Sequence, residues 1–155
     1  MPSPVVLELT NDFYLNYPSQ NYPEILQKRE RPYLCLYIRT CYGFDICIPY
    51  RTSINHKYSY RFKNSQRSKQ HNSGLDYTKV VIVTDPKYLN NKIKTIDKDE
   101  YLETVRNLKR ITKDVIQYVE DYMFHVCNIK LLSSQEFLRR YEWSTLKYFH
   151  AELGI

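Results

Sequence analysis

The sequence is poor in glycine, with three glycines among its 155 residues. Phosphate-binding loops and dinucleotide-binding motifs both need clustered glycines, because their backbone approaches a phosphate closely. Long apolar runs are also missing, since the longest strongly apolar run, Leu34–Ile38, is far shorter than the ~20 residues of a membrane-spanning helix. Met1–Pro4 leads into no signal-peptide core. These absences argue against nucleotide-driven chemistry and favour a cytoplasmic protein without a membrane segment.

Metal-binding cysteine patterns are absent as well. The four cysteines form no C-x-x-C pair, and no histidine lies at the short spacing of a zinc site: Cys35, Cys41, Cys47 and Cys127. Three of them lie in or beside strand-like segments, where a reduced cysteine behaves as a small apolar residue. We therefore expect buried thiols, no metal site and no cofactor.

The positive charge is concentrated in one segment that has no acidic residues. Between Asp45 and Asp76 the sequence has no Asp or Glu but six basic residues: Arg51, Lys57, Arg61, Lys63, Arg67 and Lys69. Subtracting these six from the 23 Lys and Arg leaves 17, which equals the 17 Asp and Glu, so the segment accounts for the net charge of +6. Such a charge run is either a solvated face or a site for a polyanion. Aromatic residues lie among the charges, as stacking on unpaired bases requires: Tyr50, Tyr58, Tyr60 and Phe62. The segment therefore favours binding of single-stranded nucleic acid.

Strand-like segments come first along the chain and helical segments last, which predicts a single α+β domain, residues 1–155, with an antiparallel sheet. The predicted strands are Val5–Leu9, Tyr33–Arg39, Phe44–Ile48 and Lys79–Thr84. The second and third read as a hairpin whose connection contains Gly43.

The last third of the chain is predicted to be helical. From Tyr101 onward, apolar residues recur at steps of three and four and form one stripe: Val105, Leu108, Ile111, Val115, Val119, Tyr122 and Val126. We expect a core-facing helix with a break near Asn107, and a second helix that Ser133 caps and that continues to Gly154. The stretch Arg51–Ser73 has little apolar periodicity and reads as a long polar loop.

The stretch Arg51–Lys57 contains the residue types that metal-free RNA cleavage needs. That reaction needs a group to remove the 2′-hydroxyl proton and cations to stabilise the phosphorane. Imidazole changes charge near neutral pH, so His56 is the candidate acid or base. Arg51 and Lys57 are candidates to offset the developing charge, and Thr52 and Ser53 to hold a phosphate oxygen. Alternatives stay open, because a loop histidine is often only solvated and Thr52–Ser53 also suits a turn cap. The other histidines lack a partner at a motif spacing and are interpreted as structural or surface residues: His71, His125 and His150.

Several stretches of the sequence resemble the type III toxin–antitoxin endoribonucleases of the ToxN, CptN and TenpN group. They are Arg31–Leu36, Ile48–Tyr58, Gly74–Ile82, Asp85–Tyr88 and Ser144–His150. The resemblance covers the chain from about Pro23 to its end and is closest to the CptN and TenpN branches. It implies a twisted antiparallel sheet, partly barrel-like and related to the Kid and MazF toxins, with flanking helices.

The resemblance also implies metal-independent, sequence-selective RNA cleavage that leaves 2′,3′-cyclic phosphate and 5′-hydroxyl ends. Thr52–Ser53 and Tyr33 are similar to an element of the ToxN branch, and His56 fits the CptN and TenpN branches. The expected catalytic residues are therefore His56, Arg51, Thr52, Ser53, Lys57 and Tyr33.

The expected partners are an RNA substrate and a small repeated pseudoknot RNA that inhibits the toxin in a hetero-oligomeric protein–RNA assembly. The residues expected to bind RNA are Arg61, Lys63, Arg67 and Lys69 on the backbone, and Tyr58, Tyr60 and Phe62 as stacking platforms. Abortive infection is the biological role that the family suggests. The alternative is a non-catalytic RNA-binding module that uses the same basic segment only for affinity.

Overall fold

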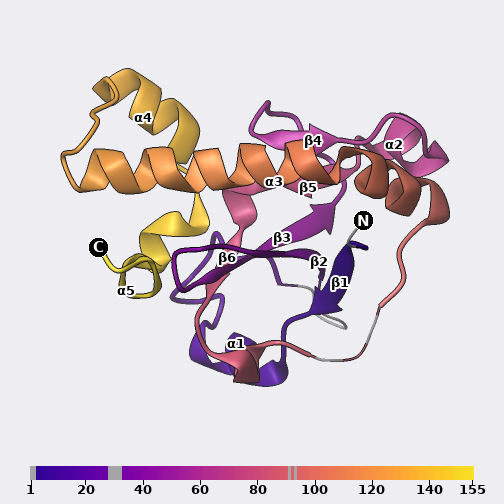
Figure 1. Cartoon of the computed structure of the whole chain (residues 1–155), viewed down its shortest axis with the longest axis horizontal. Helices are drawn as coiled ribbons and strands as arrows, with labels where there is room; N and C mark the ends of the chain where they lie inside the picture. Colours follow the sequence, from indigo (N-terminus) through magenta and orange to yellow (C-terminus); the bar gives the residue numbers. More distant parts are fainter. Residues whose placement is uncertain (1–2, 28–32, 91, 93) are drawn as a thin grey trace.

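The chain folds into a six-stranded antiparallel sheet that is crossed by one long helix, with shorter helices at the C-terminal end (Figure 1). The computed structural model describes residues 3–27, 33–90, 92 and 94–155. The strands are β1 (Val5–Glu8), β2 (Leu34–Arg39), β3 (Asp45–Arg51), β4 (Ser59–Arg61), β5 (Gly74–Asp76) and β6 (Val81–Val83). The helices are α1 (Asn11–Asn16), α2 (Gln66–His71), α3 (Lys98–Val126), α4 (Ser134–Tyr141) and α5 (His150–Leu153), with 3₁₀ turns η1 (Tyr77–Lys79), η2 (Pro86–Tyr88) and η3 (Thr145–Tyr148). The predicted α+β class is confirmed. Met1–Pro2 and Arg31–Pro32, which the sequence analysis used, lie outside the described residues.

The centre of the sheet is β3, which has neighbours on both edges. One edge pairs with β2 in a register that places Cys35 opposite Pro49. The other edge pairs with β6 near the start of β3 and with β5 near its end. The strand order is β1-β2-β3-β5-β4, and among the described strands no pairing joins β1 to β4, so the sheet is open. The predicted hairpin is confirmed, and Gly43 in its turn has a φ of 85°, a conformation that glycine adopts without steric cost.

The long helix α3 is continuous over 29 residues, so the predicted break near Asn107 is wrong. The Asn107 side chain donates to the backbone oxygen of Glu103, one turn earlier, and stays within the helix. The core-facing side carries Ile111, Val115 and Val119, whereas Val105, predicted to be in the apolar stripe, is 41% exposed. Among the described residues, no helix is both long and apolar enough to cross a membrane.

The second predicted helix is divided into separate pieces. Ser133 caps α4 as predicted, since its hydroxyl accepts from the backbone N–H of Glu136. After α4 the hydroxyl of Ser144 accepts from the N–H of Leu146 and starts η3. Because the capping side chain gives the backbone a hydrogen bond outside the helix ladder, the chain turns there and α5 follows as a separate helix.

Two of the four thiols are buried as predicted. Cys35 and Cys47 lie in β2 and β3, and burial raises the pKa of Cys35 to about 12. The prediction is wrong for Cys41 and Cys127, which are exposed. Cys41 lies in the turn between β2 and β3, and Cys127 directly follows α3, so neither side chain reaches the core.

Residues 51–73, here called the basic segment, are not the long polar loop that the sequence suggested, because they contain β4 and α2. Two carboxylates from α3 accept hydrogen bonds from the segment and fix it on the helix. Glu103 accepts from the hydroxyl of Tyr60 and from the backbone N–H groups of Lys63 and Asn64. Glu100 accepts from the hydroxyls of Ser65 and Ser73. These contacts satisfy polar groups that a solvated loop would leave to water.

Gly74 is the position in this part of the sheet where a side chain has no room. It pairs with Arg51 of β3 and Arg61 of β4, and a Cβ there would lie 2.3 Å from the carbonyl oxygen of Tyr60. We expect Gly74→Ala to lower the free energy of unfolding by about 3 kcal/mol, because β4 and β5 must separate to accept the methyl group.

The measurement for Gly74→Ala is urea unfolding, with Gly43→Ala as the control. A Cβ at Gly43 meets nothing within 4 Å. That change should therefore lower the free energy of unfolding by only about 1 kcal/mol, the cost of an alanine in a left-handed backbone conformation. Equal losses in the two variants would contradict the close approach of β4 to β5.

Candidate active site

Two of the predicted catalytic residues meet on one buried carboxylate, that of Asp76. Asp76 is the last residue of β5, and its side chain has no exposed surface. Nη1 of Arg51, at the end of β3, lies 3.0 Å from Oδ2 of Asp76. Nε2 of His56 lies 3.2 Å from Oδ1. The pairing of β3 with β5 is what brings Arg51 next to this carboxylate.

The Asp76 carboxylate is held in place by Thr78 as well. Oδ1 accepts from the backbone N–H of Thr78 at 2.9 Å and from its hydroxyl at 2.6 Å, and this turn starts η1. Burial alone would raise the pKa of Asp76, but the hydrogen bonds from His56 and Thr78 and the charge of Arg51 outweigh it and hold the pKa below its usual value. The carboxylate is therefore ionised at neutral pH, and it accepts a hydrogen bond from each of these neighbours.

His56 has both ring nitrogens engaged. Nε2 faces Asp76, and Nδ1 accepts a hydrogen bond of 3.2 Å from the backbone N–H of Tyr58. These partners favour the neutral tautomer with the proton on Nε2, which leaves the lone pair on Nδ1. Since the ring is 29% exposed, a ligand at the surface reaches it.

A polar groove of about 450 Å³ opens beside His56. It is lined by Asn55, His56, Lys57, Ser59, Tyr60, Arg61, Lys63 and Arg110. Four of these residues are cations, and none of them is acidic. The groove therefore suits an anionic ligand that runs past the His56 ring.

Thr52 and Ser53 lie on the loop between Arg51 and His56. Ser53 is exposed with a φ of 61°, and its backbone N–H donates to the carbonyl of His71 after α2 closes back on the loop. A left-handed backbone at a non-glycine residue is a strained conformation that often marks a functional site. Neither hydroxyl has a role assigned by the described contacts, so their part in catalysis stays a prediction.

Lys57 and Tyr33, the remaining predicted catalytic residues, lie in different parts of the structure. Lys57 lines the groove, with its ammonium 5.6 Å from the centre of the Tyr58 ring. Tyr33 directly precedes β2, and because Cys35 pairs with Pro49, it lies at the end of the sheet where β3 reaches Arg51. Its supporting role stays a prediction.

The predicted stacking platforms are wrong for Tyr60 and Phe62. Both side chains are buried, at 8% and 5% exposure, and the hydroxyl of Tyr60 donates to Glu103. Phe62 packs parallel to Tyr50, with ring centres 5.9 Å apart. Tyr58 is half-buried against the core, and its hydroxyl is buried, so its stacking role stays a prediction. Tyr60 points inward from β4, and Phe62, which directly follows β4, is buried on the same alternation.

The predicted backbone-binding cations divide into two groups. Arg61 and Lys63 line the groove, whereas Arg67 and Lys69 are exposed on α2 and are not among its lining residues. Arg61 also donates to the side-chain oxygen of Asn72. RNA contact at all four positions stays a prediction.

Sequence reasoning missed Asp76, Thr78 and Arg110. Asp76 ends the acid-free segment, and the Asp-x-Thr spacing to Thr78 is a turn signal that would have marked it. Arg110 lies on α3, 47 to 53 residues along the chain from the three cations that it joins in the groove: Lys57, Arg61 and Lys63. No local pattern reports such a non-local contact.

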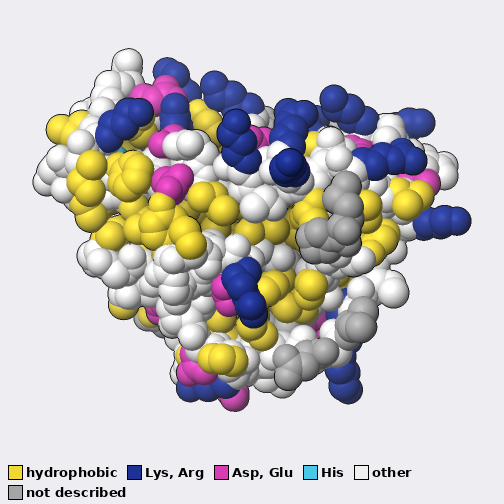
Figure 2. Space-filling model, in the orientation of Figure 1, with side chains coloured by type: hydrophobic (Ala, Val, Ile, Leu, Met, Phe, Trp, Pro, Cys, Tyr) yellow, Lys and Arg dark blue, Asp and Glu magenta, His cyan; other side chains and the backbone are white. Residues whose placement is uncertain are grey.

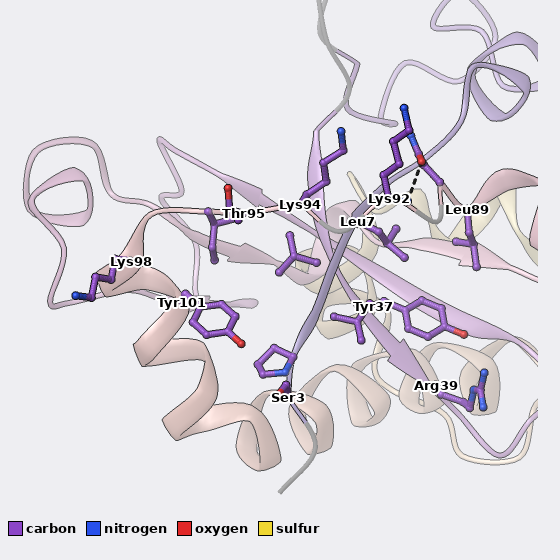
Figure 3. Close-up of a pocket in the computed structure, with 15 residues that line it drawn as sticks. Ser3, Leu7, Tyr37, Arg39, Leu89, Lys92, Lys94, Thr95, Lys98 and Tyr101 are labelled. Atoms are coloured by element: carbon purple, nitrogen blue, oxygen red, sulfur yellow. Dashed lines mark hydrogen bonds between the residues drawn. The ribbon is translucent and has the colours of Figure 1, made fainter.

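A second, larger cavity of about 850 Å³ lies beside β1 at the other end of the strand order (Figure 3). Its walls come from β1, from Tyr37 and Arg39 of β2, from the chain after η2 and from the start of α3. None of the predicted site residues lines it.

Comparisons with protein-family models, with curated proteins and with solved structures find no match to this chain. The resemblance to type III toxins therefore rests on the sequence stretches alone.

Proposed function

We propose that the groove beside His56 binds RNA and that the chain is a metal-independent endoribonuclease toxin of the type III kind. The observation that supports this most strongly is the meeting of His56 and Arg51 on the buried carboxylate of Asp76. A basic groove next to an oriented imidazole combines a phosphate-binding surface with an acid–base group.

In the proposed reaction the 2′-oxygen attacks the neighbouring phosphorus. Nδ1 of His56 takes the 2′-hydroxyl proton, after the RNA hydroxyl replaces the N–H of Tyr58 as its partner. Asp76 stabilises the imidazolium that forms. Arg51 carries five N–H donors, of which the recorded hydrogen bonds use two, so its guanidinium has donors for a phosphate oxygen. The bond from phosphorus to the 5′-oxygen breaks, and water in the open groove gives that oxygen a proton. The hydroxide that remains takes the proton from His56, which restores the neutral imidazole.

The expected independence of RNA cleavage from metal ions gives a direct test of the proposed function. Among the described residues, no group of three or more His, Cys, Asp and Glu side chains is arranged to hold a metal ion. The cations of the groove supply charge stabilisation that a magnesium ion gives in other nucleases. We expect the purified chain to cut single-stranded RNA of mixed sequence at an unchanged rate in EDTA, as measured by gel electrophoresis. Cleavage that stops in EDTA and returns with Mg²⁺ would refute the mechanism.

A non-catalytic RNA-binding module is the second candidate, and one observation favours it. Both nitrogens of His56 have partners within the protein, as expected for a histidine that only braces a loop. Geometry in a free enzyme often changes when substrate binds, and the N–H of Tyr58 is the partner that the RNA hydroxyl replaces in the proposed reaction. The two candidates differ in turnover, since only the enzyme produces new RNA ends.

The finer statements that come from the resemblance belong to the proposal. They are a fold related to the Kid and MazF toxins, inhibition by a small repeated pseudoknot RNA, and a hetero-oligomeric protein–RNA assembly active in abortive infection. A basic groove that one folded RNA covers would join binding and inhibition at the same surface.

A further inference from the structure

The exposed face of α3 carries a row of cations that continues from the groove. Arg106, Lys109, Arg110 and Lys113 are all exposed, and residues three, four and seven apart lie on the same face of a helix. We call these four residues the α3 stripe. Figure 2 shows Lys and Arg side chains gathered along the upper part of the molecule, over α3 and the β4–α2 region.

The α3 stripe is positive because the acidic residues of the same part of the helix point inward. Glu100 and Glu103 are 2% and 3% exposed. Their hydrogen bonds go to hydroxyls and backbone N–H groups of the basic segment and not to its cations. Within the part of the chain that the structure describes, the stripe forms one ion pair, between Arg110 and Asp114 at 3.6 Å, and an exposed pair of this kind contributes little.

Arg110 connects the stripe to the groove. It lines the groove, and its guanidinium lies 5.9 Å from the centre of the Tyr60 ring. Arg106 and Lys113 lie about one turn to either side of it on α3, so the stripe extends over about 10 Å of helix.

We infer that the α3 stripe binds the sugar–phosphate backbone of RNA next to the nucleotides held in the groove. The residues from Arg106 to Lys113 include no aromatic side chain, so contact there is with phosphates and reads no bases. RNA is favoured over an acidic protein because the stripe and the groove form one continuous basic surface. The inference rests on the proposed function, since it takes the groove as the RNA site.

The test is a triple variant that leaves the groove intact: Arg106→Ala, Lys109→Ala and Lys113→Ala. Alanine preserves the helix. Binding is measured by fluorescence anisotropy against salt, with a four-nucleotide RNA that fills only the groove and a twelve-nucleotide RNA that reaches the stripe. For the longer RNA we expect the salt slope to fall by about 2, and affinity at about 0.15 M salt to fall roughly 50-fold, if three single-strand phosphate contacts are lost. The shorter RNA should bind unchanged.

The control variant removes three exposed cations that lie far from the α3 stripe: Lys87→Ala, Lys92→Ala and Lys130→Ala. It has the same net charge as the triple stripe variant, so an equal loss in both would overturn the inference. So would an unchanged salt slope in the stripe variant, or a stripe that proves necessary for binding poly-glutamate but not RNA. A different result would overturn the proposed function: a wild-type chain that binds both RNAs and cleaves neither.

Discussion

His56→Ala is expected to lower the rate of RNA cleavage by roughly 10²-fold or more while RNA affinity barely changes. The reason is that Nδ1 of His56 moves a proton in the transition state, whereas the cations of the groove hold the RNA in either state. Single-turnover kinetics at saturating RNA give the rate, and fluorescence anisotropy gives the affinity. Toxicity of the expressed chain should disappear with the activity.

The matched control for His56→Ala is His71→Ala. His71 is exposed at the end of α2 and is not a lining residue of the groove, so its removal should leave the rate unchanged. A His56 variant that loses rate and affinity equally would instead make His56 a binding residue.

The second large effect is expected for Asp76→Asn. The amide keeps the shape of the side chain but removes the charge that faces Arg51 and His56. Loss of one partner in a buried ion pair costs about 3 kcal/mol or more of unfolding free energy. Activity should also fall, by roughly 10²-fold to 10⁴-fold, because a neutral amide no longer stabilises the His56 imidazolium that forms in the reaction. Asp76 is thus a positioning residue for His56.

The pH dependence of unfolding distinguishes the loss of the Asp76 charge from a general loss of packing. The pKa of Asp76 is lower in the folded chain than in the unfolded chain, so its stabilisation is fully present above about pH 4, the ordinary value for aspartate, and is lost as pH falls below that. Urea unfolding between pH 3 and pH 7 should show this loss in the wild type and a reduced loss in Asp76→Asn.

The control for Asp76→Asn is Asp45→Asn, which changes a carboxylate bonded to the Tyr37 hydroxyl at the other end of β3. That pair is half-exposed, and its loss should leave cleavage intact. If Asp76→Asn had the stability and the acid sensitivity of the wild type, the carboxylate would not organise the site.

The parts of the fold that follow from local pattern were predictable. The β2–β3 hairpin, β6 and the apolar face of α3 all show in residue spacing. The basic segment was not predictable, because β4 is only three residues long and the partners that hold the segment, Glu100 and Glu103, lie 27 to 43 residues further along the chain. A segment with so little periodicity reads as a loop until its partners are known.

The candidate site also has a part that could be predicted from the sequence and a part that could not. His56 and Arg51 were found because they lie close together in sequence and carry recognisable chemistry. Asp76 was missed because it contributes through contacts 20 and 25 residues away. Tyr60 was assigned to stacking because aromatic residues among cations suggest it, but the carboxylate of Glu103 beneath β4 gives its hydroxyl an inward partner.

The most direct measurement is the chemistry of the RNA ends after incubation with the purified chain. Mass spectrometry should find a 2′,3′-cyclic phosphate on one product and a 5′-hydroxyl on the other, both absent with the His56→Ala variant. A substrate with 2′-deoxyribose at the cleaved position should stay intact, because it lacks the attacking oxygen. Products with a 5′-phosphate, or cleavage of the deoxy substrate, would contradict attack by the 2′-oxygen and with it the role proposed for His56.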